Sequence, residues 1–168
     1  MAIAAHANRV KTYVIWLVIL SVLAFAGWQA YHVAMDQQTA RIPLTVRNAT
    51  FDVKVVDSDP ARQHGLSGTR ELAKTEGMLF VFDTEYTWGI WMKDMFISID
   101  ILWLNNDKRV IHIVKNAEPS SYPETTYRPD KPAKYVLELP AGSVEQKNIQ
   151  VGDTVTFNLA DVAKGGAE

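Results

Sequence analysis

The residues of this chain that could do chemistry are polar side chains set within apolar, strand-like runs. Asp100 interrupts one such run and Glu138 another, and Lys93 follows Trp91 at the alternating spacing of a strand. Alternate residues of a strand share a face, so these four side chains could line one face of a pocket. We therefore expect Trp91, Lys93, Asp100 and Glu138 to form a ligand-binding surface.

Other interpretations of the same charged residues stay open at this point. Strands often expose one face to water, so each charge could simply be solvated. Lys93 could also form a structural ion pair with Asp100 or Glu138. If the two carboxyl groups lie close together, they could act as the acid and base of a hydrolase. The chain has no cysteine and neither a G-x-S-x-G nor an H-E-x-x-H motif, which favours a binding protein over an enzyme and assigns no catalytic residue.

The methionines are a second set of candidate ligands. Met92 and Met95 are three residues apart, and Met78 and His112 lie in neighbouring strand-like runs. Thioethers and imidazoles suit monovalent copper, so an extracytoplasmic copper-binding protein is one alternative. Methionine also fills gaps in cores, and strand alternation puts Met92 on a continuous apolar face. We therefore expect core packing, with no metal and no cofactor.

The elements that must position these residues are mostly short strands. Alternating apolar residues and turn signals predict strands at Ile42–Val46, Phe51–Val55, Leu79–Phe82, Trp88–Met92, Phe96–Leu104, Arg109–Lys115, Tyr135–Leu139 and Val155–Leu159. Capping residues and glycines predict short helical segments at residues 61–64, 70–74 and 143–147. The proline-rich loop from Asn116 to Pro132 is expected at the rim of the pocket. This order predicts a mainly β domain over residues 42–160, a small antiparallel β-barrel or sandwich with one or two short helices.

The N-terminal part predicts a membrane protein. Residues 13–35 contain no formally charged side chain, which is long enough for a transmembrane helix preceding the β domain. Arg9 and Lys11 precede this segment and Asp36 follows it, so the positive-inside rule places residues 1–12 in the cytoplasm. We expect a single-pass signal anchor over residues 13–35. Ala24–Ala26 also fits a signal-peptide cleavage pattern, which leaves a cleavable signal peptide as the alternative.

This topology places the β domain outside the cytoplasm, facing the periplasm or the cell exterior. Residues 36–41 are then a linker, and residues 161–168, with their paired glycines, a disordered tail. The 17 basic and 19 acidic residues give a net charge of -2 without long runs of one sign, so no nucleic-acid partner is expected. The expected partners are the membrane and an unknown small ligand or protein.

The order of motifs resembles one known family. The motifs are RQHGLSG at 62–68, GMLFVF at 77–82, WMK at 91–93, IDILWL at 99–104, YVLELPAG at 135–142 and VGD at 151–153. Together they are similar to the family called domain of unknown function 192, over about Val46 to Phe157. The resemblance implies a small, mostly β domain that often follows an export signal, and implies no reaction. The sequence therefore predicts an uncharacterised, membrane-anchored extracytoplasmic β domain that binds a small ligand or a protein partner.

Overall fold

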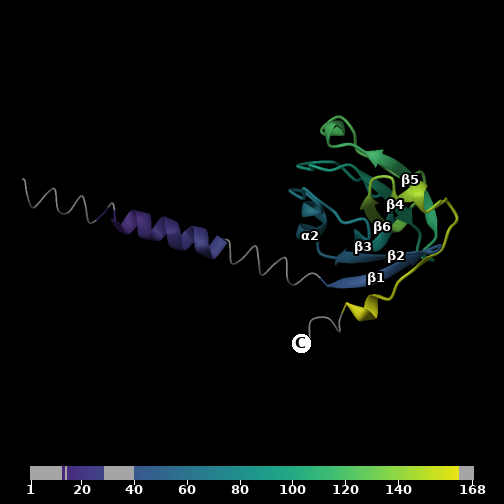
Figure 1. Ribbon diagram of the computed structural model, residues 1–168, viewed down its shortest axis with the longest axis horizontal. Helices are drawn as coiled ribbons and strands as arrows, with labels where there is room; N and C mark the ends of the chain where they lie inside the picture. The colour runs from purple at the N-terminus through teal and green to yellow at the C-terminus, as the bar shows by residue number, and fades with distance from the viewer. Residues whose placement is uncertain (1–12, 14, 29–39, 163–168) are drawn as a thin grey trace, which may run out of the picture. The chain divides into compact units, whose positions relative to one another are not determined.

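The structure is a computed structural model that describes residues 13, 15–28 and 40–162. The chain divides into two compact units, residues 1–39 and residues 40–168. Residue 13 and residues 15–28 of the first unit are helical, drawn in purple in Figure 1. Within the ranges described, no helix is long and apolar enough to cross a membrane. The transmembrane helix expected over residues 13–35 is thus not confirmed, and part of that segment lies outside the described residues, as do residues 1–12, 36–39 and 163–168.

The second unit is built on one seven-stranded sheet in the part of the chain that the structure describes. Its strand order is β5-β4-β6-β3-β2-β1-β7, and every neighbouring pair is antiparallel except β2 and β3. The strands are β1 (Arg41–Val46), β2 (Ala49–Val56), β3 (Glu76–Tyr86), β4 (Ile99–Leu104), β5 (Val110–Ala117), β6 (Ala133–Pro140) and β7 (Val155–Thr156). The expected mainly β fold is confirmed. The sheet is not wholly antiparallel as expected, because β2 and β3 are parallel, and β3 pairs on its other side with the distant β6.

The sheet curls until its two edges meet at one end (Figure 1). Arg109, just before β5, forms a β-bridge with Thr154, just before β7. Val110 N donates to Asp153 O at 2.9 Å beside that bridge. Joining the edges removes unpaired backbone groups that would otherwise be exposed there. The result is an open, barrel-like sheet.

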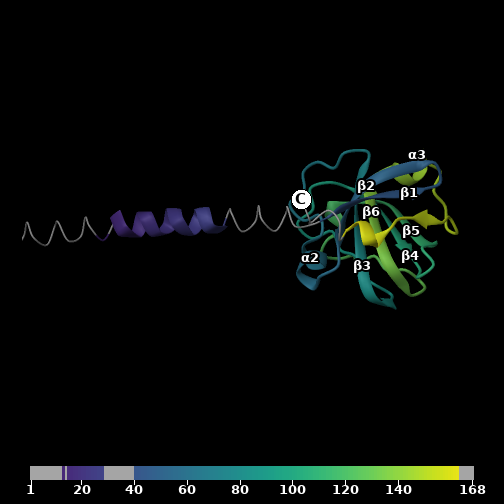
Figure 2. The ribbon, with the colours of Figure 1, turned by 90° about the horizontal axis from the view of Figure 1, so that it is seen from below.

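Short helical segments cover the sheet at opposite sides of the domain (Figure 2). Helix α2 (Asp59–His64) begins with a proline in its first turn and ends at Gly65, whose φ of 51° suits glycine. Helix α3 (Ser143–Gln146) follows β6. Both were expected from the sequence and are confirmed. The short 3-10 helices η1 (Pro119–Ser121) and η2 (Leu159–Asp161) complete the described elements.

Both faces of the sheet carry a hydrophobic cluster. The inner cluster draws on all seven strands and fills the curl. The outer cluster lies on the other face of β3, β4 and β6, where it is covered by α2, by the turn after it and by residues 87–98. Every residue of β4 is buried because the strand lies between the two clusters. A strand of this kind is apolar on both faces, as the sequence of β4 is apart from Asp100.

Two predicted elements are absent from the described part of the domain. Residues 70–74 form no helix, and the chain instead runs through a turn at residues 74–75 into β3. Residues 88–92, predicted as a strand, are a loop with one β-bridge, between Ile90 and Tyr127. The next strand, β4, begins at Ile99. The expected alternation nevertheless holds in this loop. Met92 is 1% exposed, whereas Trp91 is 47% exposed.

Candidate functional site

A cavity of about 330 Å³ opens on the outer-cluster side of the sheet. Its wall is formed by α2 and the turn after it, by the second half of β3 and by residues 88–95, and it reaches Glu138 of β6. The size is within the range of small-molecule sites. The lining side chains that determine its chemistry are Arg62, His64, Phe80, Phe82, Trp88, Trp91, Lys93 and Glu138.

Glu138 is the buried polar group of this cavity. In the sheet register it pairs with Met78 on one side and with Ile101 on the other, and both partners belong to the outer cluster. The residue is 4% exposed, and its Oε2 atom has no hydrogen-bond partner. Burial raises the pKa of the Glu138 carboxyl to about 8. At neutral pH the cavity therefore ends in an uncharged carboxylic acid.

Aromatic rings form one wall of the cavity. Phe82 and Trp88 stack with ring centroids 4.1 Å apart and an interplanar angle of 8°. The Trp88 indole Nε1 donates to Thr84 O at 3.2 Å, which fixes the ring over the end of β3. Trp91, by contrast, is half exposed at the cavity. The cavity thus combines a rigid inner aromatic pair with one accessible indole.

Arg62 of α2 lines the same cavity, but its guanidinium group already has partners. Nη1 donates to Val81 O at 2.8 Å and also to Asp57 O, and Nη2 pairs with Asp59 Oδ1. The Arg62 Cζ atom lies 5.2 Å from the centroid of the Phe82 ring, and the same ring stacks with Trp88. These contacts tie α2 to the end of β3. Arg62 therefore acts as a structural part of the wall.

Lys93 reaches the cavity because a turn holds residues 93–94 against the chain after α2. Ser67 Oγ donates to Lys93 O at 2.9 Å, and Gly68 N donates to Asp94 O at 2.8 Å. Asp94 has a φ of 57°, in the left-handed region that asparagine and aspartate tolerate. The Lys93 side chain is exposed, and the structure shows no ion pair between it and Glu138. The alternative of a structural ion pair between Lys93 and Glu138 is therefore not formed.

Asp100 does not belong to this cavity, which corrects the prediction that it lines the same surface. It pairs in register with Leu139, a residue of the inner cluster, and so lies on the opposite face of the sheet from Glu138. Asp100 is fully buried, and its two oxygens accept from Asn116 N at 2.9 Å and from Val144 N at 2.8 Å. It fastens α3 and the end of β5 to β4. A hydrolase that uses Asp100 and Glu138 together is incompatible with this geometry.

The methionines belong mainly to the hydrophobic packing. Met78 and Met92 are buried in the outer cluster, and the partly buried Met95 packs against it and also lines the cavity. His112 packs edge-on against Trp103 at 5.3 Å between ring centroids. No group of three or more His, Asp or Glu side chains that could hold a metal occurs among the residues described. These positions favour core packing over the copper-binding alternative.

The sequence had suggested that the loop from Asn116 to Pro132 lies at the rim of the cavity. None of its residues lines the cavity, and the loop instead supports the cavity wall from behind. Ile90 and Tyr127 exchange two backbone hydrogen bonds, of 2.9 and 2.8 Å. Arg128 Nη1 donates to Thr87 O at 2.9 Å. Trp103 of β4 adds a third support, since its Nε1 donates to Trp88 O at 2.8 Å. Residues 87–92 are thus held between this loop and the sheet.

Sequence reasoning placed Trp91, Lys93 and Glu138 in one site, and the cavity brings these three together. The prediction missed the contribution of α2, of β3 and of the loop after β3. The residues concerned are Arg62, His64, Phe80, Phe82 and Trp88. Part of the signal that places Phe80 and Phe82 in the cavity is local, namely their alternation along β3. Met78, Phe80 and Phe82 alternate along β3, and Met78 pairs with Glu138, so all three share its face of the sheet. That pairing is long-range and could not be read from the sequence.

The chain has relatives among proteins of known sequence. It is 28% identical over 112 residues to a UPF0127 protein of Thermococcus sibiricus, a match that covers 67% of this chain and 70% of that protein. It is 33% identical over 70 residues to a UPF0127 protein of Pyrococcus furiosus, covering 42% of this chain and 53% of the other.

Two solved structures share the fold. A crystal structure of a proposed transcription regulator from Sinorhizobium meliloti 1021 matches with a TM-score of 0.68 at 28% identity, covering 71% of this chain and 95% of that one. A protein of unknown function from Novosphingobium aromaticivorans matches with a TM-score of 0.65 at 30% identity, covering 69% and 84%. The model of the DUF192 family, described as "Uncharacterized ACR", matches residues 42–157, which include every strand of the sheet and the whole cavity lining. The chain therefore belongs to the DUF192 family of uncharacterised proteins.

Proposed function

We propose that the β domain is a small-molecule binding module and that its ligand enters the cavity and contacts Glu138. The observation that carries this proposal is the Glu138 Oε2 atom, which is buried at the cavity and has no hydrogen-bond partner. A buried polar atom without a partner loses the free energy of its hydration without compensation. Such atoms are rare in native proteins, and a ligand group that supplies the partner accounts for this one.

The chemistry of the wall supports the same proposal. A small-molecule site combines apolar surface with a few polar groups that fix the orientation of the ligand. Here Phe80, Phe82 and Trp88 provide the apolar surface, and Glu138 provides the deep polar group. The half-exposed Trp91 can cover a ligand once it is bound. A protein partner would reach Glu138 only by inserting one side chain into the cavity, so a small molecule is the simpler occupant.

A fragment screen on the full 168-residue chain, purified in detergent, tests this proposal. Binding would be followed by the NMR signals of the tryptophan indole N–H groups, assigned with single variants. Fragments that bind in the cavity should shift Trp88 and Trp91. Trp91→Ala should weaken these hits, whereas Phe96→Ala, which removes another exposed aromatic ring outside the cavity, should not. The proposal fails if no fragment shifts these signals, or if the hits bind Trp91→Ala and the unchanged chain equally well.

We further propose that residues 13–35 anchor the domain in a membrane, with the domain outside the cytoplasm. The support is the sequence, in which an uncharged apolar segment follows Arg9 and Lys11. A fusion of alkaline phosphatase after residue 168 should be active in cells and should remain in the membrane fraction at high salt. An inactive fusion would contradict the orientation, and a fusion released into the soluble fraction would contradict the anchor.

A further inference from the structure

We infer that the group that contacts Glu138 is a positively charged nitrogen, an amine or amidine, attached to a flat apolar body. This inference rests on the proposed binding function and names the class of its ligand. The inference is based on one cavity that contains both a buried carboxyl oxygen without a hydrogen-bond partner and several aromatic side chains. The missing partner of that oxygen is a group that can hydrogen-bond to the carboxyl, and the charge of that group decides how well it fits the cavity.

None of the basic side chains that line the cavity, among the residues described, takes this role. Arg62 is held by the carbonyl oxygens of Asp57 and Val81 and by the carboxylate of Asp59. Lys93 and His64 line the cavity but have exposed side chains, and neither is a hydrogen-bond partner of Oε2. The partner of Glu138 therefore comes from outside the domain.

The carboxyl group itself selects against anions. An anionic group beside Glu138 would face either a second negative charge or a carboxyl that burial keeps neutral. A neutral acceptor can satisfy the hydroxyl of the protonated acid but leaves its carbonyl oxygen without a donor. An ammonium or amidinium group offers several N–H donors, so it can satisfy both oxygens at once. Charge-assisted hydrogen bonds of this kind are also the stronger ones.

The surrounding side chains agree with a cation. Aromatic faces attract cations, and both the accessible indole of Trp91 and the ring of Phe80 line the cavity. Apart from Glu138, the charged side chains of the lining are Asp59 and Arg62, which pair with each other, and Asp83 and Lys93. These charges balance. A cation that replaces the proton of Glu138 keeps that balance, whereas an anion would disturb it.

The exchange of a proton for a cation makes binding pH-dependent. In the free chain the carboxyl, with its pKa of about 8, holds its proton at lower pH, so a cationic ligand competes with that proton there. The other charged or titratable groups facing the cavity are Asp59, Arg62 and His64 from α2 with its turn, Asp83 from β3, and Lys93 from the following loop. Outside the lining, Lys54 of β2 pairs with Met78, which pairs with Glu138, so Lys54 is on the same face of the sheet. His64 is exposed, and its effect must be separated from that of Glu138.

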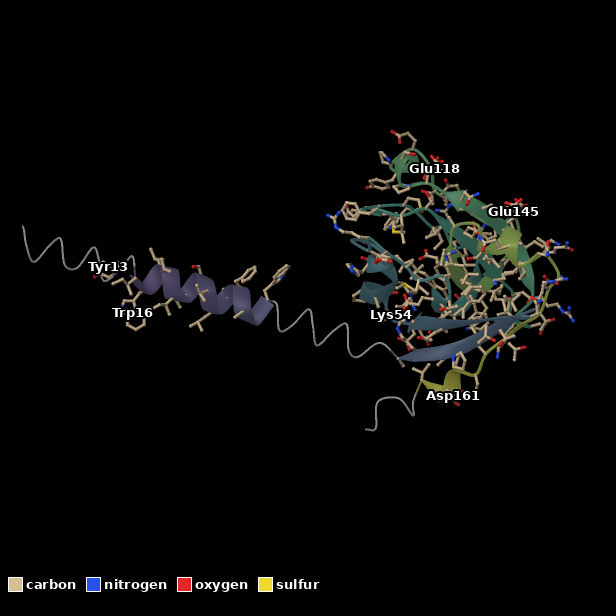
Figure 3. All side chains as sticks on the ribbon, viewed as in Figure 1. Tyr13, Trp16, Lys54, Glu118, Glu145 and Asp161 are labelled. Atoms are coloured by element: carbon tan, nitrogen blue, oxygen red, sulfur yellow. The ribbon has the colours of Figure 1, made fainter. Side chains whose placement is uncertain are left out.

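Two probes of nearly the same shape separate charge from fit. Benzamidine is a flat cation throughout the range from about pH 6 to about pH 9, and benzamide is its neutral counterpart. Their affinities for the full chain would be measured at each pH by titration of the tryptophan indole signals. The matched variants are Glu138→Gln, which removes the acid, and Glu145→Gln, which removes an exposed carboxylate on α3, away from the cavity (Figure 3). Both variants keep His64.

For the unchanged chain and for Glu145→Gln, we expect benzamidine to bind more tightly with rising pH, by up to about tenfold per pH unit below about pH 8, and to level off above it. Benzamide should bind more weakly without this rise, and Glu138→Gln should remove the rise for benzamidine. Equal binding of the two probes, or a rise that persists in Glu138→Gln, would overturn the inference about charge while leaving the binding function intact. If neither these probes nor any screened fragment shifts the cavity signals, both proposals fail.

Discussion

Asp100 and Glu138 lie on opposite faces of the sheet, although they occupy neighbouring strands and differ by only one position in register. Glu138 pairs with Ile101, the residue next to Asp100, and Asp100 pairs with Leu139, the residue next to Glu138. Directly paired residues share a face and successive residues alternate, so this offset of one separates the carboxyl groups completely. One carboxyl is fully satisfied by backbone N–H groups, and the other has an oxygen without a partner.

Asp100 should matter for stability and not for binding. Asp100→Ala leaves the N–H groups of Asn116 and Val144 without acceptors, and we expect it to lower the free energy of unfolding by about 3 kcal/mol. Urea unfolding followed by tryptophan fluorescence would measure this change. Asp107→Ala, at an exposed turn position, is the control and should cost less than about 0.5 kcal/mol. Equal stability of the two variants would show that the buried carboxylate does not hold α3 and β5 to β4.

Glu138 should make the domain less stable as the pH rises. Its pKa is about 8 in the folded chain, against an ordinary value of 4.5 for a hydrated glutamate side chain. Between these values the folded chain holds a proton that the unfolded chain has released, so stability falls with increasing pH by up to about 1.4 kcal/mol per unit. Glu138→Gln should lose this part of the pH profile, whereas Glu145→Gln should keep it. Parallel profiles for the unchanged chain and Glu138→Gln between about pH 5 and pH 8 would contradict the burial of the acid.

Gly77 should be required for the close approach of β3 and β6. A Cβ atom there would lie 2.7 Å from Glu138 O and 2.9 Å from Leu139 Cδ2, so Gly77→Ala must push two paired strands apart. We expect a loss of about 2 kcal/mol in urea unfolding. Gly89→Ala is the matched comparison. Its Cβ would lie 2.7 Å from Thr126 Cγ2 and 2.9 Å from Arg128 Cζ, which are side-chain atoms that can move, so it should cost less. The reverse order of costs would contradict this explanation.

The elements that the sequence predicted well are those that rest on local patterns. The strands around β1, β2, β5 and β6 alternate or carry continuous apolar runs, and Pro60 and Gly65 mark the ends of a one-turn helix. The pattern also identified Glu138 as a charge within an apolar strand. Such signals depend on a few neighbouring residues, so one sequence is enough to contain them.

The elements that the sequence predicted badly depend on long-range pairing. Alternation places Asp100 relative to its own strand, but the register between β4 and β6 decides which face of the sheet that side chain meets. Residues 88–92 alternate like a strand because Ile90 and Met92 contact the outer cluster, yet the loop lies over the sheet without joining it. The pairing of β3 with β6, which brings Phe80 and Phe82 onto the face of Glu138, joins segments that are far apart in the chain.

The burial of the Glu138 carboxyl without a hydrogen-bond partner underlies both the binding function and the class of ligand. A ¹³C NMR titration of this carboxyl in the full chain tests that burial directly, because burial raises its pKa. We predict a midpoint at about pH 8 in the free chain, which Glu138→Gln would assign, and a lower midpoint when benzamidine is bound. A midpoint near the 4.5 of a hydrated glutamate, unchanged by benzamidine, would contradict both. It would mean that the carboxyl is hydrated and that the cavity offers no unsatisfied partner to a ligand.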